Sequence, residues 1–169
     1  MIKSWMFFVA TAVLAASQAA AQVREGPRAW GVFASHCIAP ITEVQLPLTD
    51  GLERRTTPDW MIADVAEVYS DPRGWFAITI KGDPKGDPLI CEMQIHPEVA
   101  APSYLASLDW RDMVLADQSY IVLEEGWLFS ETATGVESFE WREPRMWVTT
   151  DFGAGGVLIL TVEETHIEG

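Results

Sequence analysis

The spacing of hydrophobic residues near the start of the chain predicts a helix. Four of them recur at i, i+3, i+4 and i+7, the positions that share one face of a helix: Trp30, Phe33, Ala34 and Cys37. We expect this helix to begin at about Pro27 and to be buried along its apolar face. Cys37 would then lie in the core.

A second helix is predicted after a connecting segment. That segment is marked by Pro40, Pro47, Gly51 and Pro58. Thr57 can cap a helix, Pro58 suits the first helical position and Asp59 suits the first turn. We therefore expect a short helix that extends to about Tyr69. Its apolar residues would be Trp60, Met61, Val65 and Val68.

Alternating residues predict a hairpin in the middle of the chain. Every second residue from Leu89 to Ile95 is apolar, and Cys91 belongs to this set, so a strand here would point the cysteine into the core. A second β-rich run precedes the turn-forming residues 81–88, in which Lys-Gly-Asp-Pro occurs twice. The two runs should pair as antiparallel strands.

The second half of the chain predicts one more helix and several strands. Residues 97–118 have near-helical spacing over their middle part, and β-rich runs occur after them at 119–133, 138–152 and 157–164. Consecutive strands joined by short turns form antiparallel pairs. We therefore predict an α+β domain with a curved antiparallel sheet of about five strands, two or three helices packed mainly on one face, and one disulfide.

The first 21 residues are typical of a secretory signal peptide. Lys3 precedes an apolar run from Trp5 to about Ala16, and three alanines end at Ala21, as at a cleavage site for small residues. The apolar run is shorter than the roughly 20 residues that span a bilayer. We expect cleavage to leave residues 22–169 as a single domain in the periplasm or outside the cell, without a membrane span.

The charge balance argues against binding to nucleic acid. The chain has 11 basic and 25 acidic residues, and removing residues 1–21 takes away one basic residue, Lys3. Nucleic acids and anionic membranes bind clustered lysine and arginine. The acidity provides solubility, and it would also suit a basic protein partner.

The two cysteines are predicted to form a disulfide. Exported proteins mature in an oxidising environment, and Cys37 and Cys91 are both expected in the core. A catalytic thiolate needs exposure and a stabilising positive neighbour, but His36 and Cys37 would point about 100° apart on a helix. The chain has no C-x-x-C motif. We therefore assign no catalytic cysteine.

No metal or cofactor is expected. His36, Cys37, Cys91 and His96 could supply zinc ligands, but the positions of Cys91 and His96 in the predicted strand differ by an odd number, so their side chains would lie on opposite faces. Asp83 and Asp87 lack the spacing of a calcium-binding EF-hand loop. The glycines at 153, 155 and 156 precede a β-rich run, whereas a phosphate loop opens into a helix.

These features leave three hypotheses for function. The first is a non-enzymatic protein-binding or envelope accessory module with an acidic surface. The second is a small-ligand or glycan binder that uses exposed tryptophans; the candidates are Trp110, Trp127, Trp141 and Trp147. The third is a hydrolase that uses paired carboxylates, but no known catalytic motif supports it. We favour the first, and the oligomeric state stays open.

Overall fold

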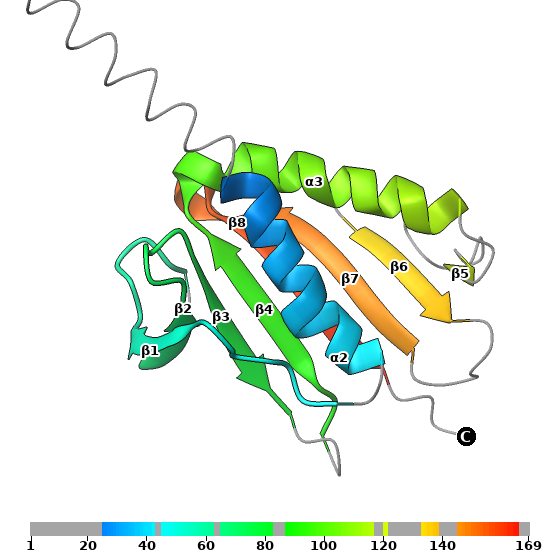
Figure 1. The fold of residues 1–169 in the computed structure, drawn as a ribbon, viewed down its shortest axis with the longest axis horizontal. Helices are drawn as coiled ribbons and strands as arrows, with labels where there is room; N and C mark the ends of the chain where they lie inside the picture. The colour runs from blue at the N-terminus through cyan, green and yellow to red at the C-terminus, as the bar shows by residue number, and fades with distance from the viewer. Residues whose placement is uncertain are drawn as a thin grey trace, which may run out of the picture.

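The computed structural model of the protein describes residues 25–42, 45–62, 65–82, 87–116, 120–121, 133–138 and 145–165. The predicted signal peptide, residues 1–21, lies outside these ranges. Within them the chain forms an open antiparallel sheet with helices on one face (Figure 1). The predicted α+β class and antiparallel sheet are therefore confirmed.

The sheet has eight strands in the order β1-β2-β3-β4-β8-β7-β6-β5. Their bounds are β1 Glu53–Thr56, β2 Glu67–Ser70, β3 Phe76–Lys81, β4 Ile90–Ile95, β5 Tyr120–Ile121, β6 Ala133–Ser138, β7 Arg145–Phe152 and β8 Leu158–Thr165. Two meanders, β1 to β4 and β5 to β8, join where β8 pairs with β4. The helix α3, Pro97–Ala116, carries the chain between the two meanders.

The sheet has more strands than the roughly five expected, partly because residues of the predicted connecting segment and of the end of the predicted second helix form two strands, β1 and β2. These strands pair antiparallel, with Thr56 opposite Glu67. The helix-start signal at Thr57 produces only one turn, in which the Met61 N–H donates to the Pro58 carbonyl at 3.0 Å. The Thr57 hydroxyl donates to the carbonyl of Val65, so the two ends of this segment are held together as a long hairpin loop.

The N-terminal helix, residues 25–42, has the predicted apolar face but runs further than expected. Its residues 25–33 are α-helical, η1 (Ala34–Ile38) is a π-turn, and α2 (Ala39–Thr42) completes it. Pro40 lies inside the helix, where it cannot donate a hydrogen bond to the His36 carbonyl. That carbonyl instead accepts the Leu48 N–H at 2.8 Å. The helix therefore passes through a proline that was expected to lie in a connecting segment.

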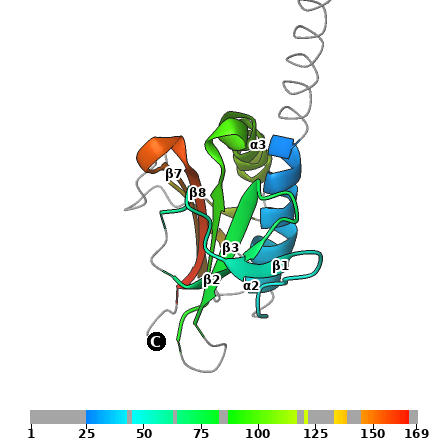
Figure 2. The same ribbon diagram turned by 90° about the vertical axis from the view of Figure 1, so that its left-hand side faces the viewer.

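The core lies between the helices and one face of the sheet (Figure 2). Alternate residues of the central strands supply its floor: Phe76, Ile78, Cys91, Met93, Ile95, Leu158, Leu160 and Val162. Phe33, Cys37 and Ile41 of the N-terminal helix pack onto it. The period-two pattern thus buries one face of each central strand, and the intervening residues lie on the opposite, open face of the sheet.

Candidate functional site

The cysteines form the predicted disulfide and offer no nucleophile. Cys37 and Cys91 are both fully buried and bonded to each other. The neighbouring His36 ring hydrogen-bonds instead to the Ser35 hydroxyl at 2.8 Å and the Asp50 carbonyl at 2.9 Å. The disulfide therefore joins the N-terminal helix to strand β4 through the core.

His96 lies in an aromatic cluster rather than a metal site. Its ring makes edge contacts with Trp60 and Trp75, at centroid distances of 5.5 and 5.7 Å. Its Nδ1 accepts the Glu98 N–H at 3.2 Å. Among the residues that the structure describes, no three histidine, cysteine, aspartate or glutamate side chains are grouped to hold a metal.

The structure places only one of the four candidate tryptophans in full. Trp110 is partly buried and packs against Trp30 at 5.5 Å, at the margin of the core. Trp127 and Trp141 lie outside the described residues, whereas Trp147 is described only by its backbone pairing with Gly135 and Glu163. Asp83, considered above for calcium binding, also lies outside the described residues. A glycan-binding role for these tryptophans stays a prediction.

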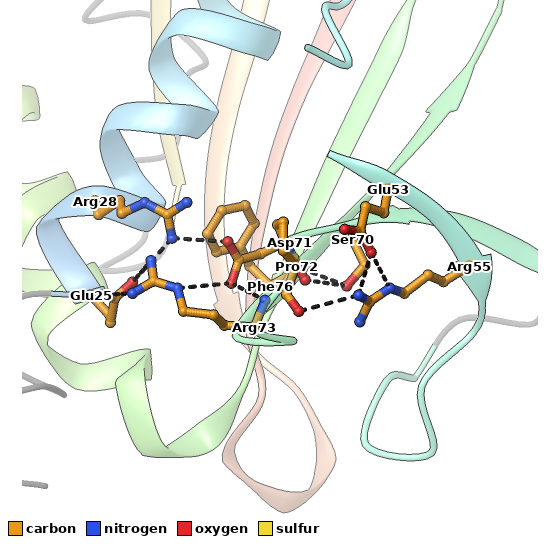
Figure 3. A network of polar contacts seen from close by, with 9 residues as sticks. All are labelled: Glu25, Arg28, Glu53, Arg55, Ser70, Asp71, Pro72, Arg73 and Phe76. Carbon is orange, nitrogen blue, oxygen red and sulfur yellow. Dashed lines mark hydrogen bonds and ion pairs between the residues drawn. The ribbon is translucent and has the colours of Figure 1, made fainter. Parts of the chain in front are cut away.

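A charged cluster fastens the N-terminal helix to the turn between β2 and β3 (Figure 3). Asp71 is fully buried and accepts hydrogen bonds from Arg28 Nη1 at 2.9 Å and from the Arg73 backbone N–H at 3.1 Å. Glu25 accepts from Arg28 at 3.1 Å and from Arg73 Nη2 at 2.6 Å. Two acids and two bases thus neutralise one another, which is typical of a structural cluster.

Arg28 of this cluster is stabilised in its charged form. Burial acts to lower the pKa of Arg28, but hydrogen bonds and charge attraction from Asp71 and Glu25 outweigh it and raise the pKa above its ordinary value. A raised pKa means that the contribution of Arg28 to folding is lost only when the pH rises through that value, in strong alkali. Arg28 therefore stays cationic at any ordinary working pH.

The open face of the sheet carries a cavity of about 320 Å³. Its lining residues come from three strands and from the loop between β1 and β2: Ile62, Val65, Thr79, Lys81, Glu92, Gln94 and Ile159. This site was not predicted from the sequence. In the predicted hairpin, polar residues alternate with core residues, and alternate residues of a strand lie on one face of the sheet. This alternation could have indicated a polar surface opposite the core.

A second surface feature is the outer face of α3. We use this name for Ala101, Leu105, Leu108, Asp109 and Asp112, which succeed one another at helical spacing. Leu105 is 61% exposed, and beside it Tyr104 contacts Phe152, which is 46% exposed. The inward side of the same helix buries Val99, Ser103 and Ser107, whereas Leu105 is presented to solvent.

Comparison of the chain with protein-family models, curated proteins and solved structures finds no match. Within the described ranges, the chain has no helix that is both long and apolar enough to cross a membrane.

Proposed function

We propose that the protein is an exported, non-enzymatic module that binds a basic protein partner through the outer face of α3. The observation that carries this proposal is the combination of exposed apolar side chains and acidic groups on that face. Contiguous exposed apolar patches that are rimmed by polar groups mark sites of protein interaction.

The charge distribution supports a basic partner. Each of the five arginines whose side chains are described pairs with an aspartate or glutamate of its own chain. Several exposed acids, in contrast, form no ion pair with a described residue, and Asp109 on the outer face of α3 is among them. A surface with a surplus of unpaired carboxylates attracts a cationic protein, and salt weakens this attraction.

Export is the second part of the proposal. It is supported by the sequence of residues 1–21 and by the disulfide between Cys37 and Cys91, because structural disulfides persist in oxidising compartments.

A matched pair of double variants tests the binding surface. Leu105→Ser with Asp109→Lys alters the outer face of α3. Leu48→Ser with Asp50→Lys makes the same two changes at another exposed leucine and aspartate, near β1. Partners captured from the envelope and secreted fractions at low salt are identified by mass spectrometry, and the affinity of each purified partner is measured by calorimetry.

We expect a basic partner whose affinity falls at least about tenfold with the α3 double variant, falls with added salt and is unchanged by the control. Capture that is equal for the wild type and the α3 double variant would contradict the proposal. A partner that is lost only with the control double variant would place the interface elsewhere.

A further inference from the structure

The cavity on the open face has a polar floor and an apolar roof. Strands β3, β4 and β8 supply the floor, where Thr79 lies opposite Glu92 and Gln94 lies opposite Ile159. The roof consists of Ile62 and Val65, from the loop between β1 and β2. The cavity lies on the side of the sheet away from α3, so a ligand in it would not touch the proposed protein interface.

The roof is fixed to the floor at several points. The Ile62 N–H donates to Gln94 Oε1 at 2.8 Å. The Ile62 side chain lies over Gly153, where a Cβ would come within 2.3 Å of its Cδ1 atom. Trp60, two residues earlier, packs on His96. The cavity is therefore preformed, which reduces the entropy cost of binding a ligand.

Gln94 organises the floor. Gln94 is only 3% exposed, and its side-chain amide makes two hydrogen bonds. Its Oε1 accepts the Ile62 N–H, and its Nε2 donates to Glu92 Oε1 at 2.8 Å. This contact holds the Glu92 carboxylate at the cavity and leaves its second oxygen available to a ligand.

Two other polar groups at the cavity have no partner among the described residues. Thr79 is 9% exposed, and no described group hydrogen-bonds to its hydroxyl. Lys81, two residues along the same strand, forms no ion pair with a described carboxylate, Glu92 included. A buried hydroxyl without a hydrogen-bond partner costs free energy. Where such a hydroxyl lines a cavity, a bound ligand can supply the missing partner.

We propose that this cavity binds a small zwitterion with an aliphatic side chain, namely a free α-amino acid. The ligand carboxylate would accept hydrogen bonds from Lys81 and Thr79, and its ammonium group would donate to Glu92. The aliphatic side chain would pack against the isoleucine and valine side chains of the roof and of β8. A cavity of about 320 Å³ is at the small end of the range for ligand sites.

Three ligands separate the parts of this recognition. L-leucine carries both charges, N-acetyl-L-leucine lacks the ammonium group, and L-leucinamide lacks the carboxylate. Binding of each to the full, disulfide-bonded protein is measured by calorimetry and by saturation-transfer NMR at neutral pH. We expect L-leucine to bind at least about tenfold more tightly than either blocked form, because hydrogen bonds to charged groups contribute more than neutral ones.

Single variants test the assigned side chains. Thr79→Val removes the hydroxyl with little change in shape, and Lys81→Met removes the ammonium group; each should weaken L-leucine binding at least about tenfold. Thr149→Val, on β7 and outside the cavity, should leave binding unchanged. Thermal unfolding shows that each variant is folded.

Three results would overturn the proposal. The first is equal binding of all three ligands, which would indicate apolar recognition alone. The second is no binding of L-leucine at about 10 mM by folded protein. The third is full affinity in both Thr79→Val and Lys81→Met.

Discussion

Gly26 lies where the N-terminal helix crosses α3, and the close approach depends on its missing side chain. A Cβ at this position would lie 2.4 Å from the Pro102 Cβ and 2.7 Å from the Ser103 nitrogen. Backbone atoms of a helix cannot move aside as a flexible side chain can. Glycine therefore fits at this crossing, whereas even alanine would require one of the two helices to shift.

Replacing Gly26 by alanine should destabilise the protein by about 1–3 kcal/mol, the usual cost of overpacking. Gly31 is a matched control in the same helix, because a Cβ there meets nothing within 4 Å. Gly31→Ala should stabilise the protein by about 0.5–1 kcal/mol, since alanine favours the helix. Urea unfolding of both variants measures the two changes, and the same sign for both would contradict this packing.

Removing the buried carboxylate of Asp71 should also be costly. Asp71→Ala would leave the Arg73 backbone N–H without its acceptor, and Arg28 and Arg73 would keep only one of their two carboxylate partners, Glu25. We expect a loss of about 2 kcal/mol, less than for a fully buried pair because both arginines are partly exposed. Asp151→Ala is the control: its carboxylate also accepts a backbone N–H but is exposed. Equal melting temperatures for the two variants would show that the cluster around Asp71 adds no stability.

At the scale of elements, the disulfide ties the N-terminal helix to the sheet. Cys37 and Cys91 are 54 residues apart in sequence, so breaking the bond frees a long loop in the unfolded chain. Cys37→Ala with Cys91→Ala should lower the free energy of unfolding by about 4 kcal/mol. Denaturant unfolding of the oxidised wild type and the double variant measures this difference. A loss below about 1 kcal/mol would mean that helix packing alone holds the helix in place.

The loop between β1 and β2 is the element that local sequence patterns mispredicted. Thr57, Pro58 and Asp59 are good helix-start residues, and they do form a turn. A start signal, however, does not determine the structure of the residues after it. Pairing of β1 with β2, and the contact of Ile62 with Gln94, determine the outcome, and both are contacts between residues well separated in sequence.

Gln94 should be the main polar anchor of this loop. Gln94→Leu removes the acceptor of the Ile62 N–H while it keeps the side chain bulky. One hydrogen bond contributes about 1 kcal/mol, so amide exchange at Ile62 should accelerate about fivefold. Hydrogen exchange monitored by NMR measures the rate, with the Ile78 amide in the central sheet as reference. An unchanged rate at Ile62 would mean that other contacts hold the roof of the cavity.

For the whole molecule, the sequence predicted the class but not the topology. The alternation of residues 89–95 correctly predicted β4 and the burial of Cys91, and the helical spacing after residue 30 predicted the burial of the other cysteine. Neither pattern could show that β8 would lie between β4 and β7. Strand order depends on which buried faces match in three dimensions, and periodicity along the chain carries no information about that.

The candidate sites divide in the same way. The net charge follows directly from the sequence. The outer face of α3, in contrast, is defined by which side of the helix packs on the sheet, and this packing buries Ser103 and Ser107 and exposes Leu105. Similarly, Thr79 and Lys81 are ordinary strand residues until the loop carrying Ile62 forms a cavity together with them. Both surfaces are created by contacts between elements, so no single stretch of sequence reveals them.

Our central proposal is that the protein is exported and that the disulfide between its N-terminal helix and its sheet forms in an oxidising compartment. The most direct test is the intact mass of the protein recovered from the producing cell, denatured and treated with a thiol-blocking reagent, without and with prior reduction. We predict a chain that begins at Gln22 and gains two blocking groups only after reduction. A chain that retains residues 1–21 and whose two thiols react without reduction would contradict both export and the disulfide.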